Sequence, residues 1–579
     1  MPGAATSKAE ADCQIEQLRR ERGFDGQHQI LSKDLYQQPS HFLLELIQNA
    51  DDNTFSSAVT PGLSLTLSGS SPRYLRTDCN EVGFTLEQVN AIATTGDSTK
   101  KAISRRQRGY IGEKGIGFKS VFKVASVVNI VSGYYEFMFE RDTPLGMILP
   151  VLSPFPSRHR LPDHTQFLLQ LGDQVEVRRI QIDLENIDPE LLIFLRKLRR
   201  LTIETNYTNT TYHVQTDTSD ATLGDTATIY STNGDENLTL DKKYAVIRFN
   251  ASRMPSDTRR EGITRSKVIL AFPIDESKSP KMGRHKAFAF LPIDDFGFKV
   301  SSMIYPTQPG PSADIIYVQF LVHADFLLVA SREGLDYGCQ WNIFLRDAIR
   351  ATFLLAVKRF ISMPAGEAGP GLRYMWPQYT KHHQSSHDFW NQLHRDILQD
   401  LRLERVLESR DASAGFYIPR QLRFTPTKFR FEGDALFDSP SLRKKQLAFQ
   451  YDGVYGQLKL LGVPRTTIQD LCQEFSDWIA EFGVAILDTK PPEWHRKVAS
   501  LFYGETGLKA HLLSLPIIPL RDGSWVNARR AHLYLEVGTT EEYVPGGINI
   551  SIVDRASTDS LQQSDPQTFN PTDFPTSLA

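Results

Sequence analysis

Three polar residues at helical spacing could do chemistry on a phosphate group: Glu45, Asn49 and Asp52, in the stretch HFLLELIQNADD. They fall at i, i+4 and i+7 and therefore share one face of a helix. An amide oxygen such as that of Asn49 suits Mg²⁺, which takes its other ligands from water and phosphate oxygens. A carboxylate one turn away, such as that of Glu45, can orient and deprotonate an attacking water. A plain surface helix would show the same polar face, so the assignment needs a phosphate site elsewhere.

A glycine-rich stretch at 109–122, GYIGEKGIGFKSVF, supplies a candidate phosphate site. Gly112, Gly115 and Gly117 leave room for a phosphate to approach the backbone. The apolar run that starts at Phe118 is compatible with a helix, whose N-terminus would offer free N–H groups. The spacing is neither that of the Walker A loop nor that of the dinucleotide-binding G-x-G-x-x-G. Taken alone, the stretch suits a tight structural turn equally well.

The elements that position these residues follow from the hydrophobic pattern. We expect a polar helix over 8–22, then a helix that starts after the N-cap Ser40 and buries Leu43, Leu46, Ile47 and Ala50. Two strands follow, at 63–67 and leading into TDCNEVGFT at 77–85. A loop, TTGDSTKK at 94–101, comes next, and the polar, cationic stretch after it, AISRRQRGYIG at 102–112, has the composition of a mobile lid over phosphates. The sequence therefore places the helix and the glycine-rich stretch in one α/β unit.

Further along, the pattern predicts a strand in VEVRRIQIDL at 175–184 and a helix in PELLIFLRKLRRL at 189–201. Residues 213–243 are polar and rich in Thr, Asp, Asn and Gly, which indicates a loop or linker. Four strands of a second α/β domain follow, in YAVIRF, KVILAFPI, KAFAFLPI and FLVHADFLL. A helix is expected over 340–362, and PIIPLRDGSWVNA at 516–528 reads as strand, turn and strand.

Composition limits the class of protein. At 579 residues the chain is long enough for about three or four domains. Its formal net charge of −3 gives no electrostatic signature for nucleic acid. We expect no signal peptide and no membrane helix. Four scattered cysteines indicate a reducing, intracellular compartment, cytoplasmic or nuclear. His382, His383, His387 and His394 suit a polar helix start better than a metal site.

The order of motifs resembles that of the GHKL ATPases, the histidine kinase-like superfamily. The pattern is E-x-x-x-N-A-x-D on a helix, then N-E-x-G-F, then G-x-x-G-x-G-F-x-S. Within this superfamily, the chain most resembles the sacsin and NO VEIN branch, which is related to heat-shock chaperone ATPase domains. The motifs that carry this resemblance are HFLLELIQNADDN, NEVGF, STKK and GYIGEKGIGFKSVF. The resemblance is strong over roughly 28–170 and implies a Bergerat-fold α/β sandwich that binds ATP and Mg²⁺.

The resemblance implies roles for individual residues. Glu45 becomes the general base and Asn49 the Mg²⁺ ligand. The remaining residues implied to line the nucleotide are Asp52, Gly83, Ser98, Thr99, Lys100, Gly112, Gly115, Gly117, Phe118 and Thr165. Classical members carry Asp-x-Gly-x-Gly, whose Asp reads the adenine amino group. Here the stretch is DCNEVG at 78–83, so Asp78 and Asn80 are both candidates for that role.

Arg332 is the second implied catalytic residue. It lies in Ala330-Ser331-Arg332-Glu333 after an apolar strand, which resembles the loop that brings an arginine to the γ-phosphate in heat-shock chaperones. Arginine suits this role as a planar, permanently charged fork. An arginine at a strand end can equally form a surface ion pair. The preceding segment, 300–319, interrupts the branch pattern and is open to two interpretations, a retained intron or a genuine surface loop.

The predicted architecture is an N-terminal extension (1–27), the ATPase domain (28–210), a polar linker (211–243), an α/β middle domain (244–362), a mixed, largely helical region (363–555) and a disordered tail (556–579). The leading hypothesis is a slow ATP-driven conformational switch with a chaperone-like or protein-remodelling role on client proteins. The alternative is a catalytically degenerate nucleotide-binding scaffold. A histidine kinase is disfavoured, no membrane or nucleic-acid partner is expected, and a homodimer stays open.

Overall fold

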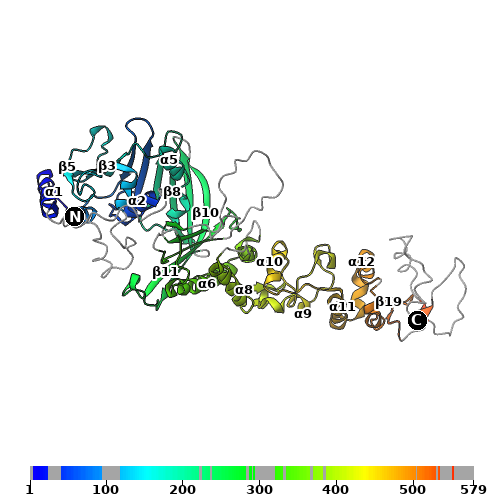
Figure 1. Cartoon of the computed structure of the whole chain (residues 1–579). Helices are drawn as coiled ribbons and strands as arrows, with labels where there is room; N and C mark the ends of the chain where they lie inside the picture. Colours follow the sequence, from blue (N-terminus) through cyan, green and yellow to red (C-terminus); the bar gives the residue numbers. More distant parts are fainter. Residues whose placement is uncertain are drawn as a thin grey trace. The chain divides into compact units, whose positions relative to one another are not determined.

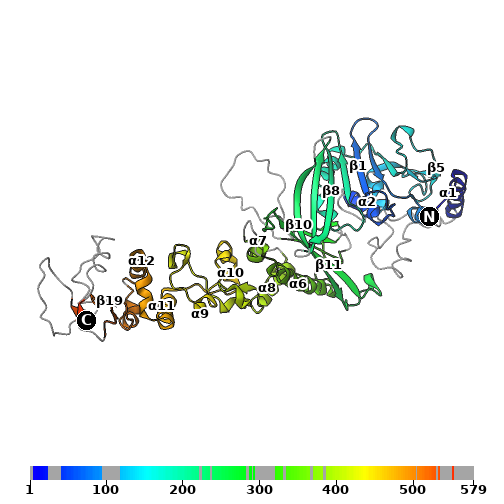
Figure 2. The same ribbon diagram turned by 180° about the vertical axis from the view of Figure 1, so that it is seen from behind.

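The computed structural model describes residues 4–23, 41–93, 118–220, 224–234, 238–281, 286–289, 291–293, 320–329, 334–364, 370–381, 387–503, 505–529, 533–534 and 551–552. The chain divides into two compact units, Met1–Ile397 and Leu398–Ala579. The candidate site lies in the first unit, which Figures 1 and 2 show from opposite sides.

One large mixed sheet runs through the described part of the first unit. Its strands are β1 (Gly62–Ser68), β2 (Tyr74–Cys79), β3 (Ala125–Ser132), β4 (Tyr135–Glu140), β5 (Val151–Leu152), β6 (Thr165–Leu171), β7 (Arg200–Glu204), β8 (Asn209–Asp220), β9 (Gly224–Asn233), β10 (Thr239–Ser252), β11 (Arg265–Ile274), β12 (Lys286–Ala289), β13 (Leu291–Ile293) and β14 (Leu321–Ala324). Their spatial order is β13-β12-β14-β11-β10-β9-β8-β7-β1-β2-β6-β3-β4-β5. The pairs β1–β7 and β12–β14 are parallel. The mixed α/β class predicted from the sequence is confirmed.

Helices and short 3₁₀ segments accompany this sheet (Figure 1). They are α1 (Lys8–Gly23), α2 (His41–Asp52), α3 (Leu86–Ile92), η1 (Phe118–Lys123), η2 (Ser157–His159), α5 (Val177–Glu185), η3 (Pro189–Ile193), η4 (Thr258–Arg260), α6 (Gln340–Ile361), α7 (Gly371–Met375), η5 (Trp376–Thr380) and α8 (Asp388–Leu401). The predicted apolar face of α2 is confirmed, because Leu43, Leu46, Ile47 and Ala50 are all buried. They share one apolar core with alternate residues of β1, namely Leu63, Leu65 and Leu67.

The predicted polar linker at 211–243 is wrong, because its described residues form β8, β9 and the start of β10. These three long strands are neighbours in the sheet (Figure 2). Threonine is a good strand former, and here it alternates along strands that stay partly exposed, so a polar composition does not indicate a loop. The strands on either side of 211–243 therefore belong to one continuous sheet, and the other domain boundaries stay predictions.

Two further predictions around residue 190 are corrected. The strand predicted at 175–184 is instead helix α5 from Val177 to Glu185, in which Ile180 and Leu184 recur at helical spacing and are both buried. The helix predicted over 189–201 is only the short η3, followed by strand β7. A side chain from α2 binds the backbone N–H groups of 196–198 that a continued helix would use, as described below.

The second unit is built from short elements. They are β15 (Leu407–Glu408), η6 (Ala412–Ala414), β16 (Phe416–Tyr417), η7 (Pro419–Gln421), η8 (Thr427–Phe429), β17 (Arg430–Phe431), β18 (Asp434–Ala435), α9 (Pro440–Arg443), η9 (Phe449–Val454), α10 (Tyr455–Leu460), α11 (Ile468–Phe482), η10 (Val484–Thr489), α12 (Pro492–Phe502), η11 (Thr506–Leu508), α13 (Lys509–Leu512), β19 (Ile518–Pro519), β20 (Trp525–Val526), β21 (Leu533–Tyr534) and β22 (Ser551–Ile552). The strand pair predicted at 516–528 is confirmed by β19 and β20 of this unit. The helix predicted at 340–362 is confirmed by α6 of the first unit.

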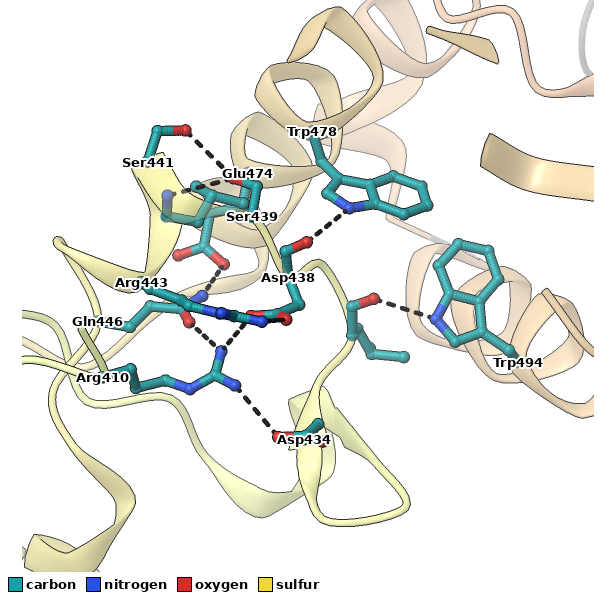
Figure 3. A network of polar contacts seen from close by, with 12 residues as sticks. Arg410, Asp434, Asp438, Ser439, Ser441, Arg443, Gln446, Glu474, Trp478 and Trp494 are labelled. Atoms are coloured by element: carbon teal, nitrogen blue, oxygen red, sulfur yellow. Dashed lines mark hydrogen bonds and ion pairs between the residues drawn. The ribbon is translucent and has the colours of Figure 1, made fainter. Parts of the chain in front are cut away.

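An aromatic core holds α11 and α12 to the segment before α9, together with the polar network shown in Figure 3. Phe437 stacks on Phe475 with ring centroids 4.6 Å apart. The indole N–H groups of Trp478 and Trp494 donate to the carbonyl oxygens of Asp438 (3.1 Å) and Leu436 (3.0 Å). Burying both indoles with their donors satisfied fixes the two helices on one short segment.

The same network contains a charged centre. The Asp438 carboxylate accepts from Arg410 at 3.0 Å and from Arg443 at 2.8 Å, and these guanidinium groups hold the pKa of Asp438 below its usual range. Arg410 also donates to Gln446 at 2.8 Å, and Gln446 donates to Glu474 of α11 at 3.2 Å. Charge-assisted bonds of this kind order the surface where short elements meet.

Candidate functional site

Helix α2 packs against η1, the segment that directly follows the glycine-rich stretch. Two elements that lie far apart in the sequence thereby pack together. Of the polar positions on α2, Glu45 is 5% exposed, Asp52 is also buried and Asn49 is only partly buried. The structure therefore puts a shielded carboxylate and a more accessible amide on the helix that packs against η1.

Asp51 fixes the end of α2. This side chain is fully buried, and its carboxylate accepts hydrogen bonds from the backbone N–H groups of Arg196 (2.9 Å), Lys197 (2.8 Å) and Leu198 (2.9 Å). Three donors aimed at one carboxylate give charge-assisted bonds that are stronger than neutral ones. The sequence reasoning missed Asp51, because an acidic residue beside Asp52 offered no signal of its own.

Lys197 and Arg196, in the connection between η3 and β7, both interact with the C-terminal end of α2. Lys197 Nζ donates to the carbonyl oxygen of Asp52 at 3.2 Å and to that of Asn53. Arg196 Nη1 lies 3.8 Å from Asp52 Oδ1. The last carbonyls of a helix lack partners within the helix and carry the negative end of its dipole, so cations stabilise them. The connection between η3 and β7 therefore anchors α2 against the sheet.

One edge of the sheet near α2 is formed where β2 and β3 end and β6 begins. Cys79 and Thr165 are direct partners across the β2–β6 ladder. The hydroxyls of Thr165 and Ser132 lie 2.6 Å apart, and Ser132 Oγ also accepts from the backbone N–H of Phe84 at 2.8 Å. Gly83 has φ +98°, a conformation that favours glycine, so the predicted turn after β2 requires this residue.

Asp78 and Asn80, the two predicted adenine-reading residues, are both committed to contacts within the protein. The Asp78 carboxylate accepts from Arg76 Nε at 2.9 Å and from Gln166 Nε2 at 2.5 Å. Because side chains alternate along a strand, Asp78 faces away from the side that Cys79 occupies. Asn80 accepts from the N–H of Gly62 at 2.8 Å and donates to the carbonyl of Thr60 at 2.9 Å.

Glu81 is a second residue that the sequence reasoning missed. It is 4% exposed, and neither carboxylate oxygen has a hydrogen-bond partner in the part of the chain that the structure describes. Burial raises the pKa of Glu81 to about 7, although the Thr165 hydroxyl and the Lys197 ammonium both lower it. A glutamate in a polar turn resembles a surface residue, so nothing in its neighbours suggested burial.

Lys119 and Phe118, at the start of η1, point into the protein. The ring of Phe118 lies 5.5 Å from that of Phe167, centroid to centroid. Lys119 Nζ donates to the carbonyl of Ile92 at 2.6 Å and to that of Met147, and it lies 4.7 Å from the ring centroid of Phe139. A lysine next to a glycine-rich stretch suggests a phosphate ligand, yet this ammonium is occupied by backbone carbonyls and an aromatic face.

Several predicted positions lie outside the described residues. They are Ser98, Thr99, Lys100, Gly112, Gly115, Gly117, Arg332, the segment 300–319 and the tail 556–579. Within the described ranges, no helix is long and apolar enough to cross a membrane, and no group of three or more His, Cys, Asp or Glu residues is arranged to hold a metal ion. Of the four histidines noted above, His387 and His394 are described, and His394 lies on α8.

Comparison with known proteins gives one relationship of moderate identity. No family model matches the chain. The chain is similar to the Protein NO VEIN of Arabidopsis thaliana, with 29% identity over 415 residues, which covers 66% of this chain. The match covers 13% of the length of that protein, so this chain corresponds to a small part of it. The finding supports a NO VEIN-like relationship.

Proposed function

We propose that the first unit binds Mg-ATP and hydrolyses it slowly, as a GHKL-type ATPase whose cycle drives a conformational change. The observation that carries this proposal is the packing of α2 against η1. This packing brings the helix of Glu45 and Asn49 against the C-terminal end of the stretch 109–122. A phosphate site needs a base and a metal ligand close to the residues that bind the phosphate, and this arrangement would supply both.

The polar residues of α2 suit different tasks in this proposal. The partly buried Asn49 would hold Mg²⁺ through its amide oxygen, and the bound metal would neutralise phosphate charge. Glu45, shielded from bulk water, would orient and deprotonate the attacking water. Thr165 and Gly83, at the strand ends beside α2, would line the adenine side.

The role of Arg332 rests on the sequence resemblance. Strand β14, which precedes it, belongs to the same sheet as β1 and β2. We propose that Arg332 contacts the γ-phosphate and so reports whether the nucleotide has been hydrolysed. We propose that this cycle serves a chaperone-like or protein-remodelling role on client proteins.

Nucleotide binding by the full chain tests the proposal first. We expect isothermal titration calorimetry to detect ATP binding that is stronger with Mg²⁺ than with EDTA. The variant Asn49→Ala should lose this dependence on Mg²⁺, whereas Asn391→Ala, on α8, should keep it. A folded wild-type chain that binds no ATP under either condition would contradict the proposal.

A catalytically degenerate nucleotide-binding scaffold is the second candidate. The observation that favours it is the commitment of Asp78 and Asn80 to internal contacts. Nucleotide binding without any turnover, equal in the wild type and in Glu45→Ala, would select this candidate.

A further inference from the structure

We propose that Glu81 recognises the base of the nucleotide and does so as a neutral carboxylic acid. This inference rests on the proposed function and adds to it a residue that sets base selectivity. It further implies that the preference for adenine over guanine nucleotides changes with pH.

The position of Glu81 follows from contacts on both sides of it. The next residue, Val82, donates its N–H to the carbonyl of Thr54 at 3.0 Å, which ties this turn to the segment after α2. Thr165, the first residue of β6, is close enough for its hydroxyl to influence the Glu81 carboxyl. Glu81 therefore lies between the end of α2 and the strand ends that would line the adenine side.

Among the described residues, neither Glu81 carboxylate oxygen has a hydrogen-bond partner, and the Thr165 hydroxyl and the Lys197 ammonium offset only part of the effect of burial. An unsatisfied polar group that is buried costs free energy, and an ionised carboxylate costs more than a neutral acid. The Thr165 hydroxyl already shares a hydrogen bond with Ser132. A ligand edge that supplies matched donors and acceptors would remove this cost.

The neighbouring charges leave the carboxyl without a strong counter-ion. Lys197 is the nearby cation, and its ammonium donates to the carbonyls of Asp52 and Asn53. The Cys79 thiol is buried, which raises its pKa and keeps it neutral. At the end of α2, Asp51 accepts from backbone N–H groups and Asp52 faces Arg196. Burial therefore dominates, and Glu81 is poised to change protonation near neutral pH.

The two protonation states match different bases. A neutral carboxylic acid has one donor and one acceptor, which pair with N1 and the N6 amino group of adenine. A carboxylate has acceptors alone, which suit the N1–H and N2 amino groups of guanine and repel N1 of adenine. A glutamine side chain keeps one donor and one acceptor at every pH, and it uses both in its known pairing with N6 and N7 of adenine, which present the same donor and acceptor pattern as N6 and N1.

The test measures the affinity of the full chain for Mg-ATP and Mg-GTP by calorimetry at about pH 6 and about pH 8.5. A group with a pKa of about 7 is protonated in only about 3% of molecules at the higher pH, so the wild type should lose about 30-fold in ATP affinity. The GTP-to-ATP affinity ratio should rise over the same interval. Any titration of ATP itself is common to all variants and cancels when they are compared.

Two variants make the test specific. Glu81→Gln should bind ATP at both pH values with nearly equal affinity. Glu474→Gln, which removes a carboxyl with a similarly raised pKa from the second unit, should keep the wild-type profile. A second measurement needs no variant: near pH 8, ATP binding to the wild type should take up close to one proton, read from titrations in buffers of different ionisation enthalpy.

The outcomes separate this inference from the function on which it rests. ATP binding with the same pH profile in the wild type and Glu81→Gln, or without proton uptake, would overturn the role of Glu81 and leave the nucleotide site standing. A folded wild type that binds neither nucleotide at either pH would overturn both.

Discussion

The carboxylate of Asp51 accepts a hydrogen bond from the backbone N–H of Lys197, 146 residues further along the chain, at 2.8 Å. The same carboxylate binds the next N–H group on either side, so it acts as a cap for a segment that is not a helix. Lys197 returns the contact through its ammonium, which binds the carbonyls at the end of α2. This reciprocal pair holds the helix of Glu45 and Asn49 in place.

The first prediction concerns Asp51. The variant Asp51→Ala leaves three N–H groups, one buried and two partly buried, without their acceptor, so we expect the free energy of unfolding to fall by about 3 kcal/mol. Urea denaturation followed by circular dichroism measures this loss. The matched control Asp173→Ala removes a fully exposed carboxylate and should change stability by less than about 0.5 kcal/mol. Equal stability of the two variants would contradict the role of Asp51.

The second prediction concerns Lys119. Replacing it by methionine keeps most of the volume but removes the donor for the carbonyls of Ile92 and Met147 and the contact with the Phe139 ring. We expect Lys119→Met to lower the free energy of unfolding by about 3 kcal/mol and to speed hydrogen exchange in α3. Lys8→Met, at an exposed position on α1, is the control. An unchanged or raised stability would show that the buried charge costs as much as its contacts gain.

The third prediction is a pH dependence in the second unit. Burial raises the pKa of Glu474 from 4.5 to about 7. The folded state therefore binds this proton more tightly than the unfolded state, and the stabilisation is complete below about pH 4.5 and lost as the pH rises through 7. At pH 8 the loss amounts to at most about 3 kcal/mol. Glu474→Gln removes the titrating group and should abolish this loss.

Hydrogen exchange of α11 measures this effect within the second unit. The wild type should exchange faster at pH 8 than Glu474→Gln, after correction for the intrinsic effect of pH, and the two should agree at pH 5. Glu505→Gln, an exposed position in the same unit, is the control. A wild type that matches Glu474→Gln at both pH values would refute the assignment.

Regular periodicity predicted the elements that position the candidate site. The apolar spacing in α2 predicted its buried face, because one stripe of a helix must face the core. The predicted strands around Leu63 and before Gly83 also correspond to β1 and β2. In these elements local pattern and tertiary environment agree.

Long-range contacts explain what the sequence reasoning missed. The segment after Pro189 has the composition of a helix, yet the Asp51 carboxylate takes the N–H groups that a helix would need. The polar composition of β8 and β9 predicts a linker, because amino-acid composition does not reveal that a segment pairs with neighbouring strands in a wide sheet. Glu81 and Lys119 look like surface residues, and only their packing shows that both are buried.

The final prediction tests the central claim, that α2 carries the base of an ATPase. We would measure steady-state phosphate release from Mg-ATP by the full chain, with Glu45→Gln and the control Gln48→Glu, a buried change on the same helix that keeps Glu45. The proposal predicts slow turnover in the wild type that falls at least about 100-fold in Glu45→Gln while ATP still binds. Wild-type turnover in Glu45→Gln would contradict it.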